Sequence, residues 1–158
     1  MDIEVNKKGI TLIELIIVMV IIAIGATLMV PGIGAWLPNY RLRSATRDIV
    51  STMRVAQMRA VSHNIEYAVS FNVGGNSYIL HRRNTGGCWD NDGDIQTLPA
   101  GIQINNITFP IDPCLNNRPL AQFNPNSTSS SGSITLINTK GTTRRIVLTA
   151  STGRVRIE

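Results

Sequence analysis

Three aspartates alternate along one short stretch of the chain, "DNDGDI". Asp90, Asp92 and Asp94 have the spacing with which an EF-hand loop begins, so their carboxylates could bind calcium. However, the sixth position of such a loop requires glycine and holds Ile95, and the twelfth requires an acid and holds Gly101. We therefore interpret the stretch as a turn rich in aspartate and glycine. No metal site is predicted, and a weak calcium site is the alternative.

The other residues of catalytic or redox type are isolated from one another in the sequence. His63 and His81 lack the serine, aspartate or cysteine partners of a nucleophilic site, so no enzyme activity and no cofactor is predicted. Cys88 and Cys114 are too few for a zinc site and form no Cys-x-x-Cys pair. If the C-terminal part is exported, they are expected to form one disulfide that stabilises the fold by roughly 3 kcal/mol. Two buried, reduced thiols are the alternative.

Positive charge gathers in the C-terminal third of the chain. The 158 residues carry a formal net charge of +5. After Asp112 there are six basic residues and one acid, and six minus one equals the whole excess. The basic residues are Arg118, Lys140, Arg144, Arg145, Arg154 and Arg156, and the acid is Glu158. Such a surface is usually solvated, but it could attract anionic polymers or lipid headgroups.

A single carboxylate, Glu14, stands at the start of the most apolar part of the chain, and no charged residue follows it until Arg41. As a helix, residues 10–30 measure about 30 Å, enough to cross a bilayer core. Lys7 and Lys8 precede them, which predicts a cytoplasmic amino end and export of the remainder. Because a carboxylate at membrane depth costs a few kcal/mol, Glu14 is a functional candidate.

A helix in two halves is expected to carry these residues. Pro31 and Gly32 are predicted to interrupt it, since proline removes a backbone donor and clashes with the preceding turn. An amphipathic half then covers 31–64, with Asn64 as the predicted stop. Its apolar stripe is expected to pack on a β domain and consists of Leu37, Leu42, Ala45, Ile49, Met53, Ala56, Ala60 and Val61.

From Glu66 onward the period changes to two, which predicts short strands. They are expected at 66–73, 77–83, 101–109, 132–138, 144–150 and 153–158. The first two should form a hairpin and the last three a meander. The polar stretch 124–132 is expected to be a mobile loop. The predicted fold class is α+β, with a long N-terminal helix packed on a C-terminal antiparallel β-sheet or sandwich domain at 65–158.

The sequence "KKGITLIEL" resembles the type IV prepilin signal, in which a short basic leader and a glycine precede a hydrophobic residue and Thr-Leu-Ile-Glu-Leu. The resemblance implies that residues 1–9 are a leader, that a prepilin peptidase cuts after Gly9, and that Ile10 becomes the N-methylated first residue. It also implies assembly roles for Glu14, whose carboxylate would meet the amine of a neighbouring subunit, and for Pro31. An uncut signal-anchor helix is the alternative.

Three further stretches are similar to the GspH/FimT branch of minor pilins and pseudopilins: "RSATRDIVSTMRVAQMRAVSHN", "LPAGIQI" and the terminal "TRRIVLTASTGRVRIE". The resemblance implies a pilin-like subunit of a type II secretion pseudopilus or a type IV pilus, which supports filament initiation, assembly and protein secretion. The implied partners are prepilin peptidase, other major and minor pilins or pseudopilins, the inner-membrane assembly platform and the lipid bilayer. The implied location is the bacterial inner membrane, crossed once by residues 10–30, with the C-terminal domain in the periplasm.

The ending "GRVR" indicates an alternative function. Some FimT-like members with a C-terminal Gly-Arg-x-Arg motif are DNA receptors in natural transformation. On a strand, Arg154 and Arg156 would point to one face, and Arg144, Arg145 and Lys140 could extend a patch that follows phosphates. A solvated Arg-x-Arg strand that protects a sheet edge is the favoured interpretation, because no aromatic residues for base stacking alternate with the arginines.

Overall fold

The structure is a computed structural model that describes residues 9–158, with side chains throughout this range except at 28–33 and 35. The chain divides into two compact units, Met1–Leu37 and Pro38–Glu158. The predicted leader up to residue 8 and the side chain of Pro31 lie outside what the structure describes. Over the described part of the chain, no helix meets the length and apolarity expected of a membrane span.

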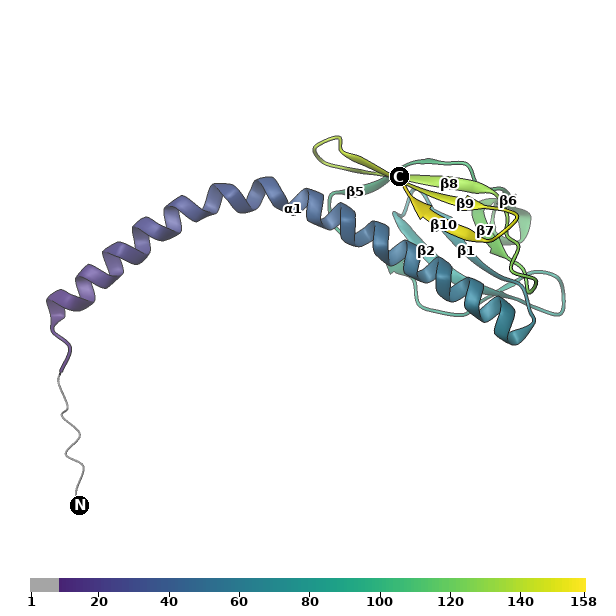
Figure 1. Cartoon of the computed structure of the whole chain (residues 1–158), viewed down its shortest axis with the longest axis horizontal. Coiled ribbons are helices and arrows are strands. Elements are labelled where there is room, and N and C mark those ends of the chain that lie inside the picture. The colour runs from purple at the N-terminus through teal and green to yellow at the C-terminus, as the bar shows by residue number, and fades with distance from the viewer. Residues whose placement is uncertain (1–8) are drawn as a thin grey trace, which may run out of the picture. The chain divides into compact units, whose positions relative to one another are not determined.

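One helix, α1 (Leu12–His63), runs through the first unit and into the second (Figure 1). The predicted stop at Asn64 is confirmed: its backbone is left-handed, with φ 54°, a conformation that asparagine adopts more readily than most residues. The predicted interruption at Pro31 and Gly32 is wrong, because the backbone is helical at both. A proline removes one backbone hydrogen bond, and the bonds of the adjacent turns maintain the helix.

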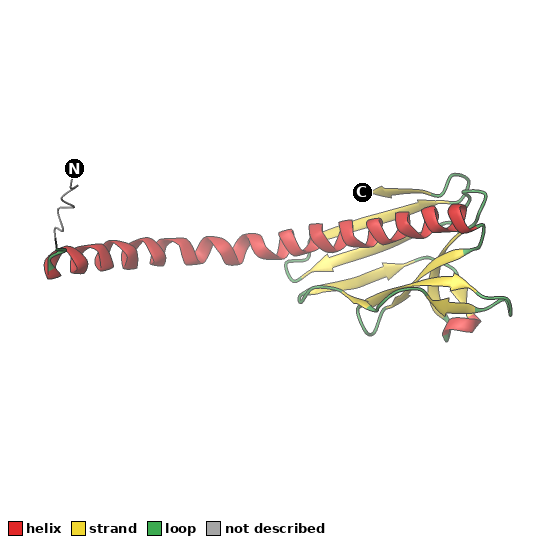
Figure 2. Cartoon of the chain, turned by 90° about the horizontal axis from the view of Figure 1, so that it is seen from below, coloured by secondary structure: helices red, strands yellow, loops and turns green. Residues whose placement is uncertain are grey.

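Two antiparallel sheets follow α1 in the second unit (Figure 2). The strands of the six-stranded sheet are β1 (Tyr67–Asn72), β2 (Ser77–Arg83), β3 (Trp89–Asn91), β4 (Gln96–Thr97), β6 (Ile111–Asp112) and β7 (Arg118–Phe123). Their order is β3-β2-β1-β7-β6, with β4 paired to β2 off this path. The strands of the four-stranded sheet are β5 (Ile102–Ile107), β8 (Gly132–Asn138), β9 (Thr143–Thr149) and β10 (Arg154–Ile157), in the order β10-β9-β8-β5.

The predicted strands, hairpin and meander are confirmed. β1 pairs antiparallel with β2, and β8 pairs with β9 as β9 does with β10. The sequence did not predict β3, β4, β6 and β7, nor the short 3-10 helix at Pro113–Leu115. A long helix packed on antiparallel sheets confirms the α+β fold class.

The core of the second unit lies between α1 and the inner faces of both sheets. Six residues of the predicted stripe are almost fully buried: Leu42, Ala45, Ile49, Met53, Ala56 and Ala60. They join Phe71 of the larger sheet and Ile134 of the smaller one in a single cluster. Burying an aliphatic or aromatic side chain of this size contributes about 1.5–3 kcal/mol. Val61 is not part of the stripe, since 48% of its surface is exposed.

The segment 124–131 is not the loosely held loop that its composition predicts. The Asn124 N–H donates to the Thr128 carbonyl at 2.8 Å, and the Ser130 N–H donates to the Gln122 carbonyl at 2.9 Å. The Ser129 N–H donates to the Ala150 carbonyl at 2.9 Å. Short polar side chains allow such turns because they bond to nearby backbone groups. The segment therefore connects β7 of one sheet to the end of β9 in the other.

Candidate functional site

The predicted cleavage site lies in a non-helical segment directly before α1. Gly9 and Ile10 are exposed and precede the first helical turn. The Glu14 N–H donates to Thr11 Oγ1 at 3.3 Å, so Thr11 caps the helix. With Glu14 three residues later, this is the spacing of a capping box, and a carboxylate there also interacts favourably with the positive end of the helix dipole. The Glu14 backbone N–H thus takes part in the cap, and assembly is the predicted role of its carboxylate.

Apolar side chains cover the first turns of α1 on every face. From Ile10 to Ile24 the large apolar side chains are between 49% and 77% exposed. They are Ile10, Leu12, Ile13, Leu15, Ile16, Ile17, Val18, Met19, Val20, Ile21, Ile22 and Ile24. Because these positions are nearly consecutive, they leave no polar face, and a helix of this kind is normally buried in a membrane or among other helices.

The terminal arginines lie on one face of β10, the edge strand of the four-stranded sheet. Arg154 and Arg156 are exposed and pair with positions 149 and 147 of β9. Residues two apart on a strand share a face, so Arg145 joins them there. The Arg145 guanidinium donates to Ser133 Oγ at 3.1 Å, and Arg156 forms an ion pair with Glu158 at 3.3 Å. We call Arg145, Arg154 and Arg156 the outer basic face.

Arg144 lies on the opposite face of β9 from Arg145. It pairs with Leu136, whose side chain is fully buried in the core. The expectation that Arg144 extends the same patch is therefore wrong, since consecutive residues of a strand alternate between faces. Lys140 lies in the turn between β8 and β9, where its backbone N–H donates to Asn138 Oδ1 at 3.0 Å, so it belongs to neither face of the strands.

A close contact at Gly153 fixes the start of β10. Its backbone is left-handed, with φ 58°, and it is buried. A Cβ at this position would lie 2.7 Å from the Ser127 carbonyl oxygen and 2.5 Å from Gln57 Nε2. Gln57 in turn donates to the Thr152 carbonyl at 3.4 Å. The turn before Arg154 is thus held between α1 and the segment 124–131.

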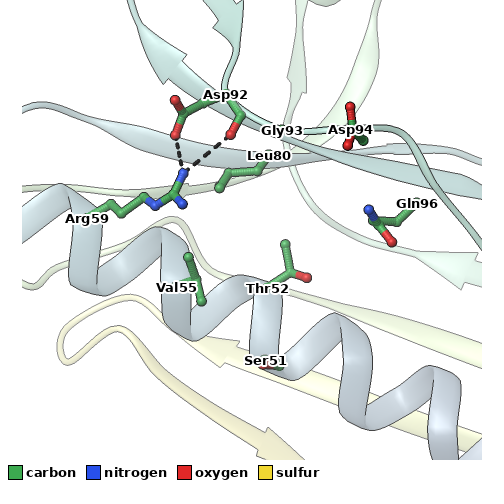
Figure 3. Close-up of a pocket in the computed structure, with 9 residues that line it drawn as sticks. All are labelled: Ser51, Thr52, Val55, Arg59, Leu80, Asp92, Gly93, Asp94 and Gln96. Atoms are coloured by element: carbon green, nitrogen blue, oxygen red, sulfur yellow. Dashed lines mark hydrogen bonds and ion pairs between the residues drawn. The ribbon is translucent and has the colours of Figure 1, made fainter.

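The three aspartates of the calcium hypothesis have separate partners. Asp90 Oδ1 accepts a hydrogen bond from Asn84 Nδ2 at 3.1 Å, and Asp92 forms an ion pair with Arg59. Figure 3 shows Asp92 bonded to Arg59, with which it lines a cavity of about 220 Å³, while Asp94 lies apart from both. Within the described residues, no group of three or more acidic, histidine or cysteine side chains could hold a metal. The geometry favours a turn.

A second, smaller core lies on the outer face of the six-stranded sheet. Cys88 and Cys114 form a disulfide with their Cα atoms 5.6 Å apart, next to the buried side chain of Trp89. The Trp89 indole donates to Asp112 Oδ2 at 2.9 Å, and the Arg83 guanidinium lies 4.7 Å from the ring centroid. The disulfide therefore connects the β2–β3 loop to the segment before β7.

His81 lies beneath this second core, where its side chain is buried and contacts a serine. It is 2% exposed, and its Nε2 lies 2.7 Å from Ser70 Oγ. Burial lowers the pKa of His81, and the positive charge of Arg118 lowers the same pKa further. The neutral imidazole is favoured. His63, at the end of α1, has its Nδ1 2.7 Å from the Tyr67 hydroxyl.

Two family models match the sequence. The prokaryotic N-terminal methylation motif matches residues 5–30, and the family described as Type II transport protein GspH matches residues 45–153. The chain belongs to the GspH family. The GspH match ends one residue before Arg154, so it includes only Arg145 of the outer basic face. Comparison with curated protein sequences finds no match.

Solved structures share the fold of this GspH-family chain. The minor pseudopilin EpsH of the Vibrio cholerae type 2 secretion system gives a TM-score of 0.62 at 10% identity, over 75% of this chain and 96% of that one. E. coli GspH gives 0.60 at 13% identity, over 76% and 89%. The Pseudomonas aeruginosa type IV minor pilin FimU gives 0.57 at 14% identity, over 76% and 90%. At these identities the likeness shows the fold alone.

Two structural features of this GspH-family chain are not among the features predicted from its sequence. The cap at Thr11 has a recognisable signal, since Thr-x-x-Glu is the capping-box spacing. The contact of Gly153 with Gln57 and Ser127 has none, because the three residues are distant in the sequence. A Ser-Thr-Gly turn predicts a reversal of the chain, but not that the glycine packs against a helix.

Proposed function

We propose that this GspH-family chain is a minor pilin or pseudopilin, a structural subunit of a type II secretion pseudopilus or a type IV pilus that supports filament assembly and protein secretion. One observation carries the proposal: the apolar side chains at 10–24 are exposed on all faces of α1, and Glu14 in the first turn is the one charge among them. A surface of this kind is stable in a bilayer or in a bundle of packed helices. The methylation motif and the family match support the same conclusion.

The first proposed step is proteolytic processing of the subunit. Prepilin peptidase removes residues 1–9 by cutting after Gly9, and Ile10 becomes the N-methylated terminus. Residues 10–30 anchor the subunit in the inner membrane, and 31–64 and 65–158 lie in the periplasm as the second half of the helix and the β domain. The backbone at Gly9 and Ile10 is not helical, so the bond that would be cut lies outside α1, which supports this proposal.

The proposed assembly step pairs Glu14 of one subunit with the methylated amine of Ile10 in its neighbour. In the low dielectric of a bilayer or helix bundle, this attraction is far stronger than in water and fixes the axial register of the two helices. The partners would be other major and minor pilins or pseudopilins and the inner-membrane assembly platform. Pro31 would adjust the helix where it leaves the packed bundle.

Mass spectrometry of the chain purified from a host with prepilin peptidase tests the processing step. We expect a mature protein that begins at N-methyl-Ile10. A chain that keeps Met1, or that is cut elsewhere, would contradict the proposal and favour an ordinary signal-anchor helix.

Three variants separate the charge of Glu14 from its role in capping the helix. Glu14→Gln and Glu14→Ala remove the charge and keep the hydrogen bond from the backbone N–H of residue 14 to Thr11 Oγ1. Thr11→Ala removes this cap, at about 1 kcal/mol, and keeps the charge. We expect all three to insert in the membrane, and Glu14→Gln and Glu14→Ala to lose incorporation into filaments. If Thr11→Ala fails to assemble while Glu14→Gln assembles normally, the assembly role of the charge is refuted.

The outer basic face supports a second candidate function, a DNA-binding minor pilin that acts in DNA uptake. Arg145, Arg154 and Arg156 share one face of the β9–β10 hairpin at the edge of a sheet, where they could follow a phosphate backbone. The ion pair between Arg156 and Glu158 weakens this candidate, because a carboxylate beside the patch repels phosphate.

Mobility shift of the full chain in neutral detergent with duplex DNA tests this candidate. If the outer basic face binds DNA, Arg154→Ala with Arg156→Ala should weaken binding and reduce its dependence on salt, by about one unit of slope per lost contact. Arg144→Ala, on the opposite face of β9, is the matched control and should leave binding unchanged. Binding that is absent, insensitive to salt or equal in all variants would exclude the candidate.

A further inference from the structure

The strand β10 has a strand beside it on one side only. Within residues 9–158, β10 pairs with β9 and with no other strand. Arg145 and Glu158 exchange both backbone hydrogen bonds, at 3.0 Å and 2.8 Å. Because such pairs alternate along an antiparallel ladder, the N–H and C=O groups of Val155 and Ile157 point away from β9. These four backbone groups form an open edge with which another extended chain could pair.

The two faces of this open edge differ in chemistry. The two arginines of β10 are exposed on the outer basic face. Val155 and Ile157 alternate with them and point to the inner face, since they pair with Leu148 and Ile146, which are buried in the core. Ile157 itself is 41% exposed. A strand added beside β10 would therefore meet positive charge on its outer face and apolar surface on its inner face.

A groove on α1 borders the start of β10. It has a volume of about 430 Å³ and is lined by Arg54, Gln57, Met58, Val61, Ser62 and Ser127. Gln57 donates to the Thr152 carbonyl in the turn before β10, and the Ser127 carbonyl lies against Gly153 in the same turn. We call this the α1 groove.

The helical positions place the apolar part of the α1 groove on the open side of β10. Met53 and Ala60 lie on one side of Gln57 around the helix and are buried in the core. Met58 and Val61 lie on the other side, at 3.6 residues per turn, and are 64% and 48% exposed. Since Gln57 itself contacts the turn before β10, the exposed pair lies beyond that strand and continues its inner face.

The charge of the open edge determines which partner fits it. Antiparallel pairing with β10 of a second copy would gather the arginines of both copies on one face, and like charges across a ladder are destabilising. A carboxylate is already accommodated there, because Glu158 forms an ion pair with Arg156 at 3.3 Å. Arg54 adds positive charge at the α1 groove. The complementary chain is thus acidic on one face and apolar on the other.

We propose that the open edge of β10 binds an extended segment of a partner protein in which acidic and apolar residues alternate. The segment adds a strand to the four-stranded sheet through the outward backbone groups of Val155 and Ile157. Its carboxylates pair with Arg154 and Arg156, and its apolar side chains continue the inner face toward the α1 groove. This contact goes beyond the proposed function, since it lies within Pro38–Glu158 and requires neither cleavage nor membrane insertion.

Fluorescence anisotropy of the full chain in neutral detergent tests the proposal, with a labelled synthetic peptide of alternating glutamate and valine as the probe. We expect saturable binding of this peptide. Two modified peptides test the backbone pairing: one is N-methylated at its valines and the other at its glutamates. Successive N–H groups of a strand point to opposite sides, so one modified peptide should bind like the original and the other should lose binding.

Variants of the chain test the two halves of the contact. Ile157→Pro removes an outward N–H that β9 does not use, and it should bind the peptide about two- to tenfold more weakly than Ile157→Ala, which keeps that N–H. Arg154→Glu with Arg156→Glu replaces two attractive cross-strand pairs by repulsive ones, and it should weaken binding at least about fourfold. The matched control, Arg43→Glu with Arg82→Glu, makes the same change of charge on exposed residues of α1 and β2. It should bind like the unaltered chain, and near-UV circular dichroism confirms that each variant is folded.

Several outcomes would overturn the proposal. Equal affinities of the two N-methylated peptides, or of Ile157→Pro and Ile157→Ala, would show charge attraction without strand addition. Equal weakening in the two charge-reversed variants would show that the open edge is not the binding site. Duplex DNA that binds through Arg154 and Arg156 where the peptide does not bind would assign these arginines to nucleic acid. A chain that lacks N-methyl-Ile10 but binds the peptide at β10 would refute the proposed function and leave the open-edge proposal standing.

Discussion

Gly153→Ala should destabilise the second unit more than the addition of a single methyl group suggests. Gly153 is buried with φ 58°, so alanine there would adopt a left-handed backbone. Its new Cβ would also lie 2.7 Å from the Ser127 carbonyl oxygen and 2.5 Å from Gln57 Nε2. The side chain of Gln57 can move, whereas the Ser127 carbonyl belongs to a segment that is hydrogen-bonded to both sheets.

The expected decrease in the free energy of unfolding has two parts. A left-handed backbone costs a residue with a Cβ about 1–2 kcal/mol, and forcing an extra methyl group into a packed site costs about 1–3 kcal/mol. Alanine also removes entropy from the unfolded chain, which offsets about 0.4–1 kcal/mol, so the free energy of unfolding should fall by about 1–4.5 kcal/mol. Gly141→Ala isolates the first part, because Gly141 has φ 78° with no heavy atom within 4 Å of the added Cβ. We expect it to cost about 1 kcal/mol, after the entropy that alanine removes from the unfolded chain.

Urea unfolding of the full chain in neutral detergent, followed by near-UV circular dichroism, measures both variants. Gly153→Ala with Gln57→Ala should recover only part of the loss, since the clash with the Ser127 carbonyl remains. Unfolding free energies of Gly153→Ala and Gly141→Ala that agree within about 0.5 kcal/mol, the scale of an ordinary surface substitution, would refute the argument that Gly153 is packed against α1.

Three other predictions test separate parts of the fold. Cys88→Ser with Cys114→Ser should lower the free energy of unfolding by about 3 kcal/mol; urea unfolding equal to that of the oxidised chain would show that the crosslink adds no stability. Burial lowers the pKa of His81, so the unfolded chain accepts a proton below about pH 6.5 that the native chain resists. The free energy of unfolding should then fall on acidification by up to about 1.4 kcal/mol per pH unit, and a slope unchanged in His81→Asn would assign the effect to another group. Asn64→Ala should lower the thermal midpoint and Asn64→Gly should not, because φ is 54° at the helix stop; equal midpoints would contradict that role.

The sequence predicts those strands in which apolar and polar residues alternate and turn residues mark the ends, as in the β1–β2 hairpin. β7 was missed because Pro119 argues against a strand with neighbours on both sides. The pairing explains why the proline is tolerated. β1 pairs only with Leu120–Phe123, beyond the proline, and Pro119 borders the two-residue strand β6. A sequence pattern does not show at which residue of a strand its hydrogen bonds to a neighbour begin, so the pairing of β7 could be identified only in the structure.

The candidate sites were predictable only where one short stretch contains the whole site. The period of two placed Arg154 and Arg156 on one face, and β10 pairs as expected. Asn39 of α1 and the turn between β8 and β9 are far apart in the chain, and Asn138 connects them through hydrogen bonds that no spacing indicates. The capping residue Thr11 is predictable from its distance to Glu14, because Thr-x-x-Glu is the spacing of a capping box.

The turn between β8 and β9 controls which residues of the hairpin face solvent. One residue inserted at 139–142 would shift the register of β9 by one position against β8. Arg144 and Arg145 would then exchange faces, and the buried side chains of Ile146 and Leu148 would turn outward. Substitutions in this turn leave the register of β9 unchanged. A change of one residue in its length would alter the core and the faces of Arg144 and Arg145 at once. Among variants of the chain, the length of the turn should be more constant than its composition.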